Sequence, residues 1–289
     1  MGALTDGPRS VLITGASSGL GLSMAARLAE EGWLVYATMR DPGRRGDLDA
    51  AVRKAGIDVD HVRVLRLDVR CPDTIRSALD QVGEETGGSL DAVVNNAGLN
   101  AEACFEDIDM DAIRNVFDTH VFGAMEVTRA ALPLLRKAGN ARIIFVSSWA
   151  AVFGGPMIGI YAAAKSATER FAESLVWELA QDGIRVSVLR PGFHRSNIFS
   201  GNSGRVRPSE SRYGPIYSKL DPLAEKSISH ARDPQNVARQ VARILNSQRP
   251  GFRYNIGFDS YLVMACNPAI PQRLRSLAAR ALFKSRETS

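Results

Sequence analysis

The stretch that decides the fold is Ser10–Gly21, SVLITGASSGLG, near the start of the chain. Five residues typical of a buried strand run directly into a glycine-rich turn and then into an amphipathic helical pattern. Gly15, Gly19 and Gly21 let the backbone turn tightly and let an anionic group approach without interference from a Cβ atom. The start of a helix also offers unpaired N–H groups and the positive end of the helix dipole. The stretch therefore predicts a turn that binds the pyrophosphate of a dinucleotide.

Short β-branched segments alternate with longer helical patterns along the rest of the chain. Such alternation indicates a parallel sheet with helices on both faces and ligands at the carboxyl ends of the strands. We therefore predict an α/β, single-domain Rossmann fold, a doubly wound parallel sheet of about seven strands. The predicted strands are Ser10–Thr14, Trp33–Thr38, Val62–Leu67, Asp91–Val94, Ala141–Val146, Ile184–Leu189 and Phe252–Ile256. The predicted helices are Leu20–Glu31, Pro72–Thr86, Asp109–Lys137, Tyr161–Gln181 and Pro234–Asn246.

Two segments depart from this rhythm. Asn197–Pro222 is rich in Ser, Gly, Pro and Arg and predicts a long loop, either an active-site lid or a solvated insertion. Pro271–Arg286 predicts a basic amphipathic helix, which either packs on protein or, as the less favoured alternative, contacts an anionic membrane. We divide the chain into a catalytic domain of residues 1–260, with a lid at about 196–231, and a C-terminal basic helical extension of residues 261–289.

Composition narrows the classes of function. The chain has 289 residues, 45% of them hydrophobic, and a net charge of +5 without a basic block, so we expect no nucleic-acid partner. Its three cysteines lie far apart, which argues against a disulfide framework or a metal site. The N-terminus lacks a secretory signal pattern and no run of apolar residues is long enough to span a membrane, so we expect a cytoplasmic protein.

The end of the second predicted strand, VYATMRD, bears on which dinucleotide binds. A site for NAD(H) would place a carboxylate there to bind the adenosine 2′-hydroxyl. This chain has Met39 followed by Arg40, whose guanidinium can hold a 2′-phosphate, and Ser18 can donate a further hydrogen bond. Asp41 either weakens this effect or pairs with Arg40. The sequence favours NADP(H) over NAD(H).

Residues 161–165, YAAAK, place Tyr161 and Lys165 one helical turn apart on the same face. A neighbouring ammonium and the positive nicotinamide stabilise a phenolate, so we expect the pKa of Tyr161 to fall toward neutrality. The strand RIIFVSS ends at Ser148, where a hydroxyl can bind a substrate oxygen. Asp68 closes the third strand and Asn95–Gly98 closes the fourth, at the same ligand-binding edge.

Six motifs occur in the order and spacing of one family. They are TGASSGLG, the strand-ending LDV, NNAG, Ser148, Y-x-x-x-K and the RPG of Arg190–Gly192. Over about Ser10–Ile256 the chain resembles the short-chain dehydrogenase/reductase family, and VYATMRD and the region after Pro234 resemble its 17β-hydroxysteroid and retinol dehydrogenase branch. The resemblance implies a homodimer or homotetramer and an oxidoreductase that interconverts a carbonyl and a secondary alcohol with NADP(H).

The same resemblance implies a role for each matched position. Tyr161 is the general acid/base, Lys165 binds the nicotinamide ribose and lowers the pKa of Tyr161, and Ser148 orients the substrate oxygen. The other implied cofactor contacts are Gly15, Ser17, Ser18, Gly19, Leu20 and Gly21 at the pyrophosphate, Asp68 and Val69 at the adenine, Asn96, Ala97 and Gly98 at its ribose, and Pro191 and Gly192 at the carboxamide.

This chain departs from the family pattern at two positions. His120 stands where the family usually has an asparagine that helps to hold a water next to the catalytic lysine. His120 either keeps that relay with a changed pH dependence, because histidine titrates near neutrality, or is a packed substitute in a slower or inactive enzyme. After RPG, His194 replaces a valine and either touches substrate or faces solvent, while Ser196 keeps the hydroxyl of the usual threonine and can serve the carboxamide.

Large apolar residues near these motifs predict a pocket for a lipophilic ketone or alcohol. They are Leu99, Trp149, Phe153, Met157, Phe193 and Phe199. Two other functions stay open: an epimerisation or other non-reductive net reaction with the same cofactor, and a non-catalytic NADP(H)-binding sensor. The intact set of Ser148, Tyr161 and Lys165 favours an enzyme.

Overall fold

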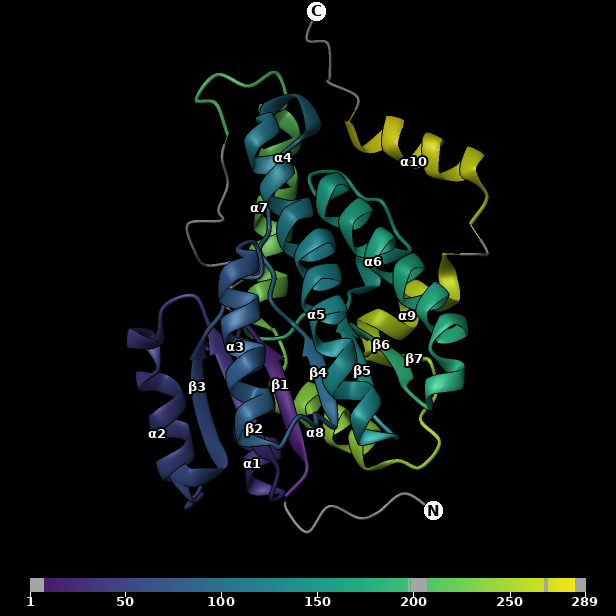
Figure 1. Cartoon of the computed structure of the whole chain (residues 1–289). Helices are drawn as coiled ribbons and strands as arrows, with labels where there is room; N and C mark the ends of the chain where they lie inside the picture. Colours follow the sequence, from purple (N-terminus) through teal and green to yellow (C-terminus); the bar gives the residue numbers. More distant parts are fainter. Residues whose placement is uncertain (1–7, 197, 199–206, 268–269, 284–289) are drawn as a thin grey trace, which may run out of the picture.

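The computed structural model describes residues 8–196, 198, 207–267 and 270–283. These residues contain one parallel sheet with the strand order β3-β2-β1-β4-β5-β6-β7 (Figure 1). The strands are β1 (Ser10–Thr14), β2 (Leu34–Met39), β3 (Val62–Arg66), β4 (Ala92–Asn95), β5 (Arg142–Val146), β6 (Arg185–Pro191) and β7 (Arg253–Ile256). Each predicted strand is present, with its ends displaced by two residues at most. The prediction of a doubly wound parallel sheet is confirmed.

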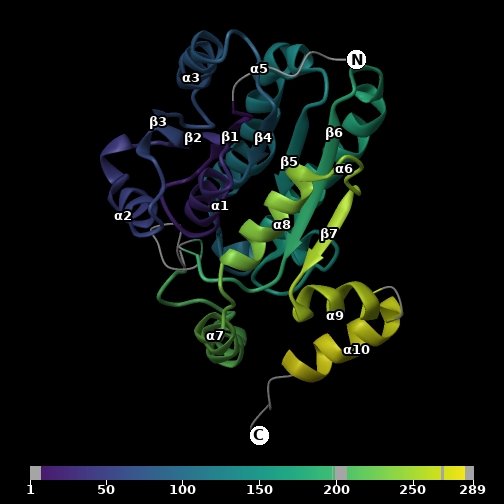
Figure 2. The same ribbon diagram turned by 90° about the horizontal axis from the view of Figure 1, so that it is seen from below.

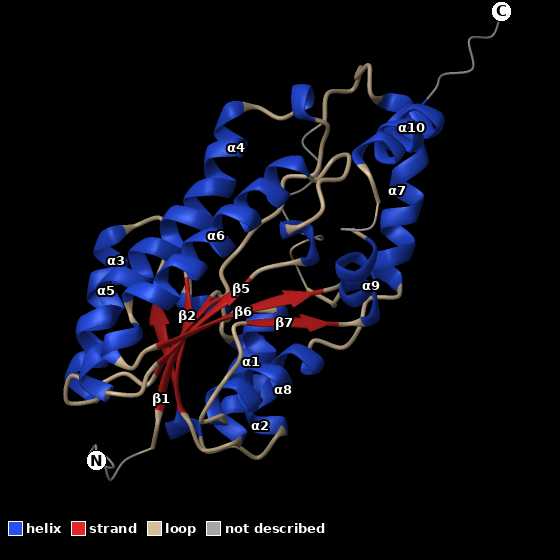
Figure 3. Cartoon of the chain, turned by 90° about the vertical axis from the view of Figure 1, so that its right-hand side faces the viewer, coloured by secondary structure: helices blue, strands red, loops and turns tan. Residues whose placement is uncertain are grey.

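Helices cover both faces of the sheet (Figure 3). One face carries α1 (Gly19–Glu30), α2 (Gly46–Lys54) and α8 (Gln235–Asn246), and the other carries α3 (Pro72–Glu85), α5 (Gly123–Ala138) and α6 (Gly159–Glu178). On the first face α1 and α8 lie side by side and bury Leu28 and Val241 completely (Figure 2). On the second face Leu135 and Phe145 are completely buried. The two hydrophobic layers fix the sheet between the helices.

The strand order sets the position of the site. From β1 the chain builds outward through β2 and β3, and then crosses to β4 on the other side of β1. A crevice therefore opens beyond the carboxyl ends of β1 and β4, which is where ligands bind in open sheets of this kind. The helices α7 (Gly214–Ser229) and α9 (Phe258–Cys266) lie beyond the carboxyl ends of β6 and β7 (Figure 3).

The predicted loop at Asn197–Pro222 is wrong from Gly214 onward, because α7 begins there and includes Pro222. Proline is compatible with the first turn of a helix, where Pro215 stands, and Tyr217 is buried on the inner side of α7. The helices α2 and α9 were also not expected from the sequence. The boundary predicted at residue 260 falls inside α9.

The predicted helix Asp109–Lys137 is divided into α4 (Met110–Phe117), a π-helical turn at Asp118–Phe122 and α5. The Asp109 carboxylate caps α4, because its Oδ1 accepts a hydrogen bond of 2.6 Å from the N–H of Ala112. The π turn is important because it carries His120 into the site.

The C-terminal helix predicted from its apolar stripe is present as α10 (Gln272–Phe283). Two of the apolar side chains of this helix, Leu274 and Leu277, are exposed. Within the described ranges, none of the helices combines the length and the apolar character that a membrane span requires.

Candidate active site

The glycine turn has the geometry of a backbone cradle. Gly15 and Gly19 have positive φ values of 70° and 56°. A Cβ atom on Gly21 would lie 2.2 Å from the carbonyl oxygen of Gly15, so a side chain there would collide with the turn. The helix α1 begins at Gly19, and the side chain of Ser18 makes no capping hydrogen bond. The N–H groups at the start of α1 are therefore available to an anion.

The NNAG segment is fixed to this turn although it lies about 80 residues further along the chain. The hydroxyl of Thr14 accepts hydrogen bonds from the N–H groups of Asn96 and Ala97 at 2.9 and 3.0 Å. The Asn96 amide donates in return to the carbonyl oxygens of Thr14 and Gly15. A Cβ atom on Gly15 would lie only 3.0 Å from Cα of Ala97. The two motifs therefore form one rigid wall of the crevice.

Arg40 lies at the carboxyl end of β2, with an exposed side chain. The structure gives this side chain no ion pair or hydrogen bond with the described residues. Asp41 does not pair with it, because Asp41 Oδ1 accepts a hydrogen bond of 2.9 Å from the N–H of Gly43. Of the two possibilities for Asp41, pairing with Arg40 is therefore wrong. The guanidinium remains able to bind a ligand beside the glycine turn.

Asp68 and Val69 follow β3. The carboxylate of Asp68 accepts a hydrogen bond of 3.0 Å from the N–H of Arg70 and lies 3.5 Å from the guanidinium of the same residue. Val69 is buried against Gly123, where a Cβ atom would lie 2.8 Å from the Val69 carbonyl oxygen. The loop after β3 is thereby held against the start of α5.

Ser148, Tyr161 and Lys165 come together at the ends of β5 and the start of α6. The hydroxyl of Ser148 accepts a hydrogen bond of 3.2 Å from the N–H of Ala150, and Ser148 lies close enough to the Tyr161 hydroxyl to lower the Tyr161 pKa. Lys165 is 5% exposed, its Nζ donates a hydrogen bond of 2.6 Å to the carbonyl oxygen of Val146, and Nζ lies 5.6 Å from the centre of the Tyr161 ring. The three side chains thus form one cluster, as the sequence predicts.

Burial sets the protonation of this cluster. Burial raises the pKa of Tyr161 to about 12, although its hydrogen bond with Ser148 acts in the opposite direction. Burial lowers the pKa of Lys165 to about 7, and the Glu169 carboxylate opposes that change. The predicted fall in the pKa of Tyr161 is therefore wrong for the protein alone, because the loss of water around a phenolate outweighs the hydrogen bond with Ser148. At neutral pH the phenol keeps its proton.

His120 lies between Leu99 and the catalytic pair. Its Nε2 accepts a hydrogen bond of 3.1 Å from the N–H of Leu99 and also lies 2.6 Å from the carbonyl oxygen of Leu99. Its ring meets that of Tyr161 edge-on, with centroids 5.4 Å apart. Burial, and next the Lys165 ammonium, lower the pKa of His120 to about 3. The expectation that His120 titrates near neutrality is wrong, and the imidazole is neutral.

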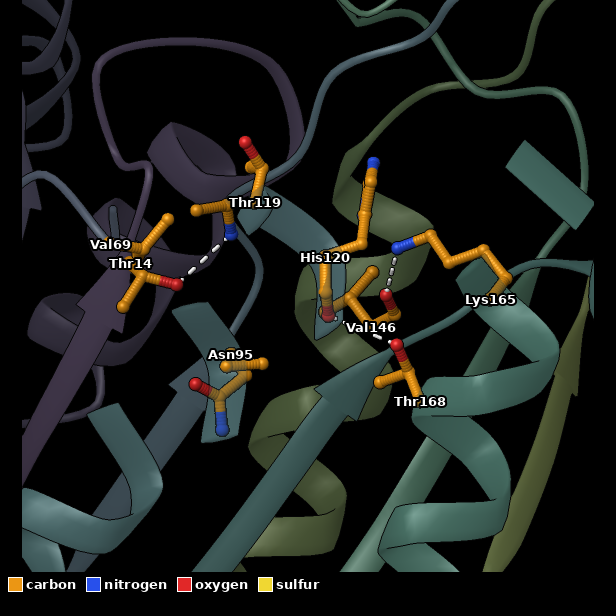
Figure 4. Close-up of a pocket in the computed structure, with 10 residues that line it drawn as sticks. Thr14, Val69, Asn95, Thr119, His120, Val146, Lys165 and Thr168 are labelled. Carbon is orange, nitrogen blue, oxygen red and sulfur yellow. Dashed lines mark hydrogen bonds between the residues drawn. The ribbon is translucent and has the colours of Figure 1, made fainter. Parts of the chain in front are cut away.

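A small cavity of about 10 Å³ lies against His120 and Lys165. Figure 4 shows the residues around it, which come from β1, β4, β5, α5, α6, the π turn and the segments that follow β3 and β4. Three atoms of the lining residues are buried without a hydrogen-bond partner in the described chain: Asn95 Oδ1, Thr119 Oγ1 and His120 Nδ1. A cavity of this size holds about one water molecule, and such waters satisfy polar groups of this kind.

The segment after β6 is held by residues from the C-terminal part of the chain. The N–H of Phe193 donates a hydrogen bond of 2.6 Å to Asp259 Oδ2, and Asp259 also pairs with Arg232. A Cβ atom on Gly192 would lie 2.1 Å from Asp259 Oδ1, so only glycine fits there. His194 is 3% exposed, and its Nδ1 lies 3.0 Å from the carbonyl oxygen of Gly192. A solvent-facing His194 is therefore wrong; the side chain packs inside this loop.

The other two residues predicted along this segment lie at its ends. Pro191 is the last residue of β6, and its register partner is Ile256 of β7. Ser196 is half-buried at the far end of the described segment. Both therefore lie at the carboxyl edge of the sheet, on the side of the crevice opposite the glycine turn.

The residues predicted to line a substrate pocket fall into separate groups. Trp149 lies 5.9 Å from both Phe153 and Phe193, measured between ring centroids, so these three side chains form one aromatic wall. Met157 instead packs in a cluster with residues of α7, and Leu99 packs in another cluster behind His120. Only the aromatic wall is therefore brought together as predicted.

The described part of the lid is attached to the body of the protein. Tyr217 of α7 accepts a hydrogen bond of 2.9 Å from the N–H of Cys104, and Arg207 pairs with Asp221 at 2.7 Å. Arg207 also stacks on the Tyr217 ring at 3.9 Å. Phe199, which was predicted to line the substrate pocket, lies outside the described residues. Among the described residues, α7 therefore packs against Cys104 and Met157.

Sequence reasoning missed three polar residues that join these segments: Thr14, Glu169 and Asp259. Glu169 has a signal, because it lies four residues after Lys165 on the same face of α6. The other two have none, because their partners lie 82 and 66 residues away along the chain.

A model of one family, described as short chain dehydrogenase, matches residues 9–204. The uncharacterized oxidoreductase YusZ of Bacillus subtilis is 35% identical over 277 residues, covering 94% of this chain and 98% of that protein. Retinol dehydrogenase 8 of Bos taurus is 33% identical over 260 residues, covering 86% of this chain and 82% of that protein.

A solved structure of a short-chain dehydrogenase from Streptomyces avermitilis has a TM-score of 0.79 and 27% sequence identity. It covers 99% of this chain and 100% of that one. The motifs, their spatial arrangement and these matches agree. This chain belongs to the short-chain dehydrogenase/reductase family of oxidoreductases and, within that family, to the branch that resembles retinol dehydrogenase 8.

Proposed function

We propose that this oxidoreductase uses NADP(H) to interconvert a carbonyl and a secondary alcohol on a lipophilic substrate, with Tyr161 as the general acid/base. The observation that carries the proposal is the meeting of half-buried Tyr161 with buried Ser148 and Lys165 in one cluster at the carboxyl edge of the sheet. A phenol next to an ammonium group and a hydroxyl group can transfer a proton to or from a substrate oxygen.

The residues fit a dinucleotide. The turn at Gly15 and Gly21 leaves no room for a Cβ atom, and the N–H groups at the start of α1 are available to the pyrophosphate. Arg40, exposed and without a protein partner among the described residues, suits the 2′-phosphate that distinguishes NADPH from NADH. We assign Lys165 to the nicotinamide ribose, and Pro191, Gly192 and Ser196 to the carboxamide.

When bound, NADPH supplies the hydride to the carbonyl carbon. Ser148 donates a hydrogen bond to the carbonyl oxygen and holds it beside the phenol. Tyr161, protonated at neutral pH because its pKa is about 12, gives its proton to the same oxygen as the alcohol forms. In the reverse direction Tyr161 accepts that proton, and the Lys165 ammonium stabilises the phenolate.

We further propose that His120 keeps a proton path with a neutral ring. The neutral imidazole lines the small cavity beside Lys165, and its Nδ1 has no hydrogen-bond partner among the described residues. One water there could hydrogen-bond to His120, Asn95 and Thr119 together. This arrangement favours the relay over a merely packed substitute, because a substitute chosen for packing would not leave three polar atoms around one cavity.

The substrate class rests on the aromatic wall of Trp149, Phe153 and Phe193, with one polar anchor at Ser148 and Tyr161. Such a site suits a large apolar molecule with a single carbonyl or hydroxyl group. The name of the bovine relative, retinol dehydrogenase 8, points to the same class. A homodimer or homotetramer remains our proposal from the family resemblance, and native mass spectrometry tests it.

Tyr161→Phe tests the central assignment. We expect kcat to fall by about 10²–10⁴-fold, the usual contribution of general acid–base catalysis, while NADPH affinity measured by fluorescence stays within about twofold. The assay is NADPH absorbance with a panel of lipophilic ketones and aldehydes, including retinal. Tyr261→Phe is the matched control, because that tyrosine is 59% exposed on α9. Undiminished turnover in Tyr161→Phe would remove Tyr161 from the mechanism.

A further inference from the structure

Glu169 has a buried carboxylate to which the proposed function assigns no role. It is 2% exposed, yet both of its oxygens are bonded. Oε1 accepts hydrogen bonds from Ser147 Oγ at 2.7 Å and from Arg190 Nε at 2.8 Å, and Oε2 accepts one from Arg190 at 2.6 Å. Arg253 of β7 lies 3.5 Å from Oε2. A buried side chain bonded in this way holds its partners in a single arrangement.

Each partner adjoins a different part of the site. Ser147 directly precedes Ser148 at the end of β5. Arg190 directly precedes Pro191 and Gly192 at the end of β6. Glu169 itself lies one turn after Lys165 and two turns after Tyr161 on the same face of α6. One carboxylate therefore joins the three segments that carry the substrate-orienting, carboxamide-binding and proton-transferring groups.

We propose that Glu169 is a positioning residue for the reaction: its carboxylate aligns the ends of β5 and β6 with the active face of α6 and keeps Lys165 in its ammonium form. This inference deepens the proposed function and rests on it. Glu169 acts on the reaction through its hydrogen-bond partners Ser147 and Arg190, neither of which is assigned to the reacting atoms.

The charges around Glu169 fix the sign of the effect. The groups that face it are Ser147 from β5, Arg190 from β6, Arg253 from β7, and Lys165 and Glu173 on its own helix. The hydrogen bonds and charges of Arg190 and Arg253 keep the pKa of Glu169 low although burial opposes them, so it is a carboxylate throughout the working range. At Lys165, burial lowers the pKa and Glu169 raises it. Removal of the carboxylate charge therefore lowers the pKa of Lys165 further.

The test compares Glu169→Gln with Glu173→Gln in the full-length protein. Glu173 is the matched control, because it also contacts Arg253 but not Ser147 or Arg190. The direct readout is the titration of the Lys165 side chain by carbon-13 NMR, which is practicable because the chain has six lysines. Lys165→Arg assigns the signal.

We expect the Lys165 titration to move to lower pH in Glu169→Gln and to stay unchanged in Glu173→Gln. When the pH is raised from about 6 to about 7.5, the reduction rate of Glu169→Gln should fall by a factor about three times larger than that of the wild type, because less Lys165 stays in its ammonium form. Because Gln leaves the buried Arg190 unpaired, Glu169→Gln with Arg190→Met is made alongside it. The double variant should recover the melting temperature but keep the displaced titration, which a purely structural role would not produce.

A Lys165 titration that is unchanged in folded Glu169→Gln or in the double variant would overturn the inference. So would an equal displacement in Glu173→Gln. The NMR readout needs no turnover, so it separates this inference from the proposed function. If the wild type reduces none of the carbonyls tested, the proposed function fails, and the titration still decides whether Glu169 controls Lys165.

Discussion

Arg40→Ala is the sharpest test of the assigned cofactor. The side chain is exposed at the carboxyl end of β2 and has no partner among the described residues, so its removal breaks no contact of the folded protein. The Asp41 carboxylate accepts a hydrogen bond from the N–H of Gly43 and forms no ion pair with the Arg40 guanidinium. Any loss of affinity for a nucleotide therefore measures what the guanidinium contributes to that nucleotide.

The expected size follows from the interaction. A hydrogen bond between charged groups contributes about 1.5–3 kcal/mol, which corresponds to a loss of about 10–150-fold in NADPH affinity. NADH lacks the 2′-phosphate, so its affinity should change by about twofold at most. The assay is isothermal titration of both nucleotides into both proteins. Because the contact is exposed, the loss should shrink as salt concentration rises.

Two controls make the result specific. Arg44→Ala removes an exposed arginine of the same loop and should leave both affinities unchanged. Arg40→Lys keeps the charge but loses the planar fork, so it should fall between the wild type and Arg40→Ala. Equal losses for NADPH and NADH, or equal losses in Arg40→Ala and Arg44→Ala, would refute the assignment of Arg40 to the 2′-phosphate.

Two further predictions concern His120 and its neighbour Gly98. The pKa of His120 is about 3 in the folded protein and about 6.5 in the unfolded chain, so stability is full above about pH 6.5 and falls below it as the unfolded chain binds the proton. Urea titrations should show about 2 kcal/mol less loss between pH 7 and pH 5 in His120→Asn than in the wild type, and parallel losses would contradict the shift. In Gly98→Ala the new Cβ would lie 2.5 Å from His120 Cε1, which should cost about 1–3 kcal/mol of unfolding free energy. The same change made in His120→Ala should cost much less, and an equal cost would show that the two residues do not collide.

The cluster of Ser148, Tyr161 and Lys165 could be predicted because its signals are local. Tyr161 and Lys165 are one helical turn apart, and Ser148 ends a strand whose β-branched pattern is clear. The glycine turn is equally local, since the strand, the glycines and the helix are consecutive in the chain. The lid was less predictable: the proline-rich composition suggested a loop, whereas burial of Tyr217 stabilises a helix from Gly214. Tertiary packing outweighed the local preference there.

The protonation of the site depended on the surroundings of each group. Ordinary pKa values predicted a titrating histidine and a phenol acidified by its lysine. The structure buries His120 completely and Tyr161 in part, and the loss of water lowers the pKa of His120 and raises that of Tyr161, so both stay uncharged at neutral pH. No pattern in the sequence reports this, because desolvation is the sum of contacts from segments that are distant along the chain.

The sequence by itself determined the doubly wound sheet, the glycine turn and the placement of Tyr161 and Lys165 on one helix face, because each depends on a local pattern of residues. Only the tertiary structure decided that Thr14 fastens the glycine turn to Asn96, that Asp259 holds the loop after β6, and that Glu169 joins three segments of the site. Hydrogen bonds and buried charges act across space, so their partners become neighbours only when the sheet brings the strand ends to one edge.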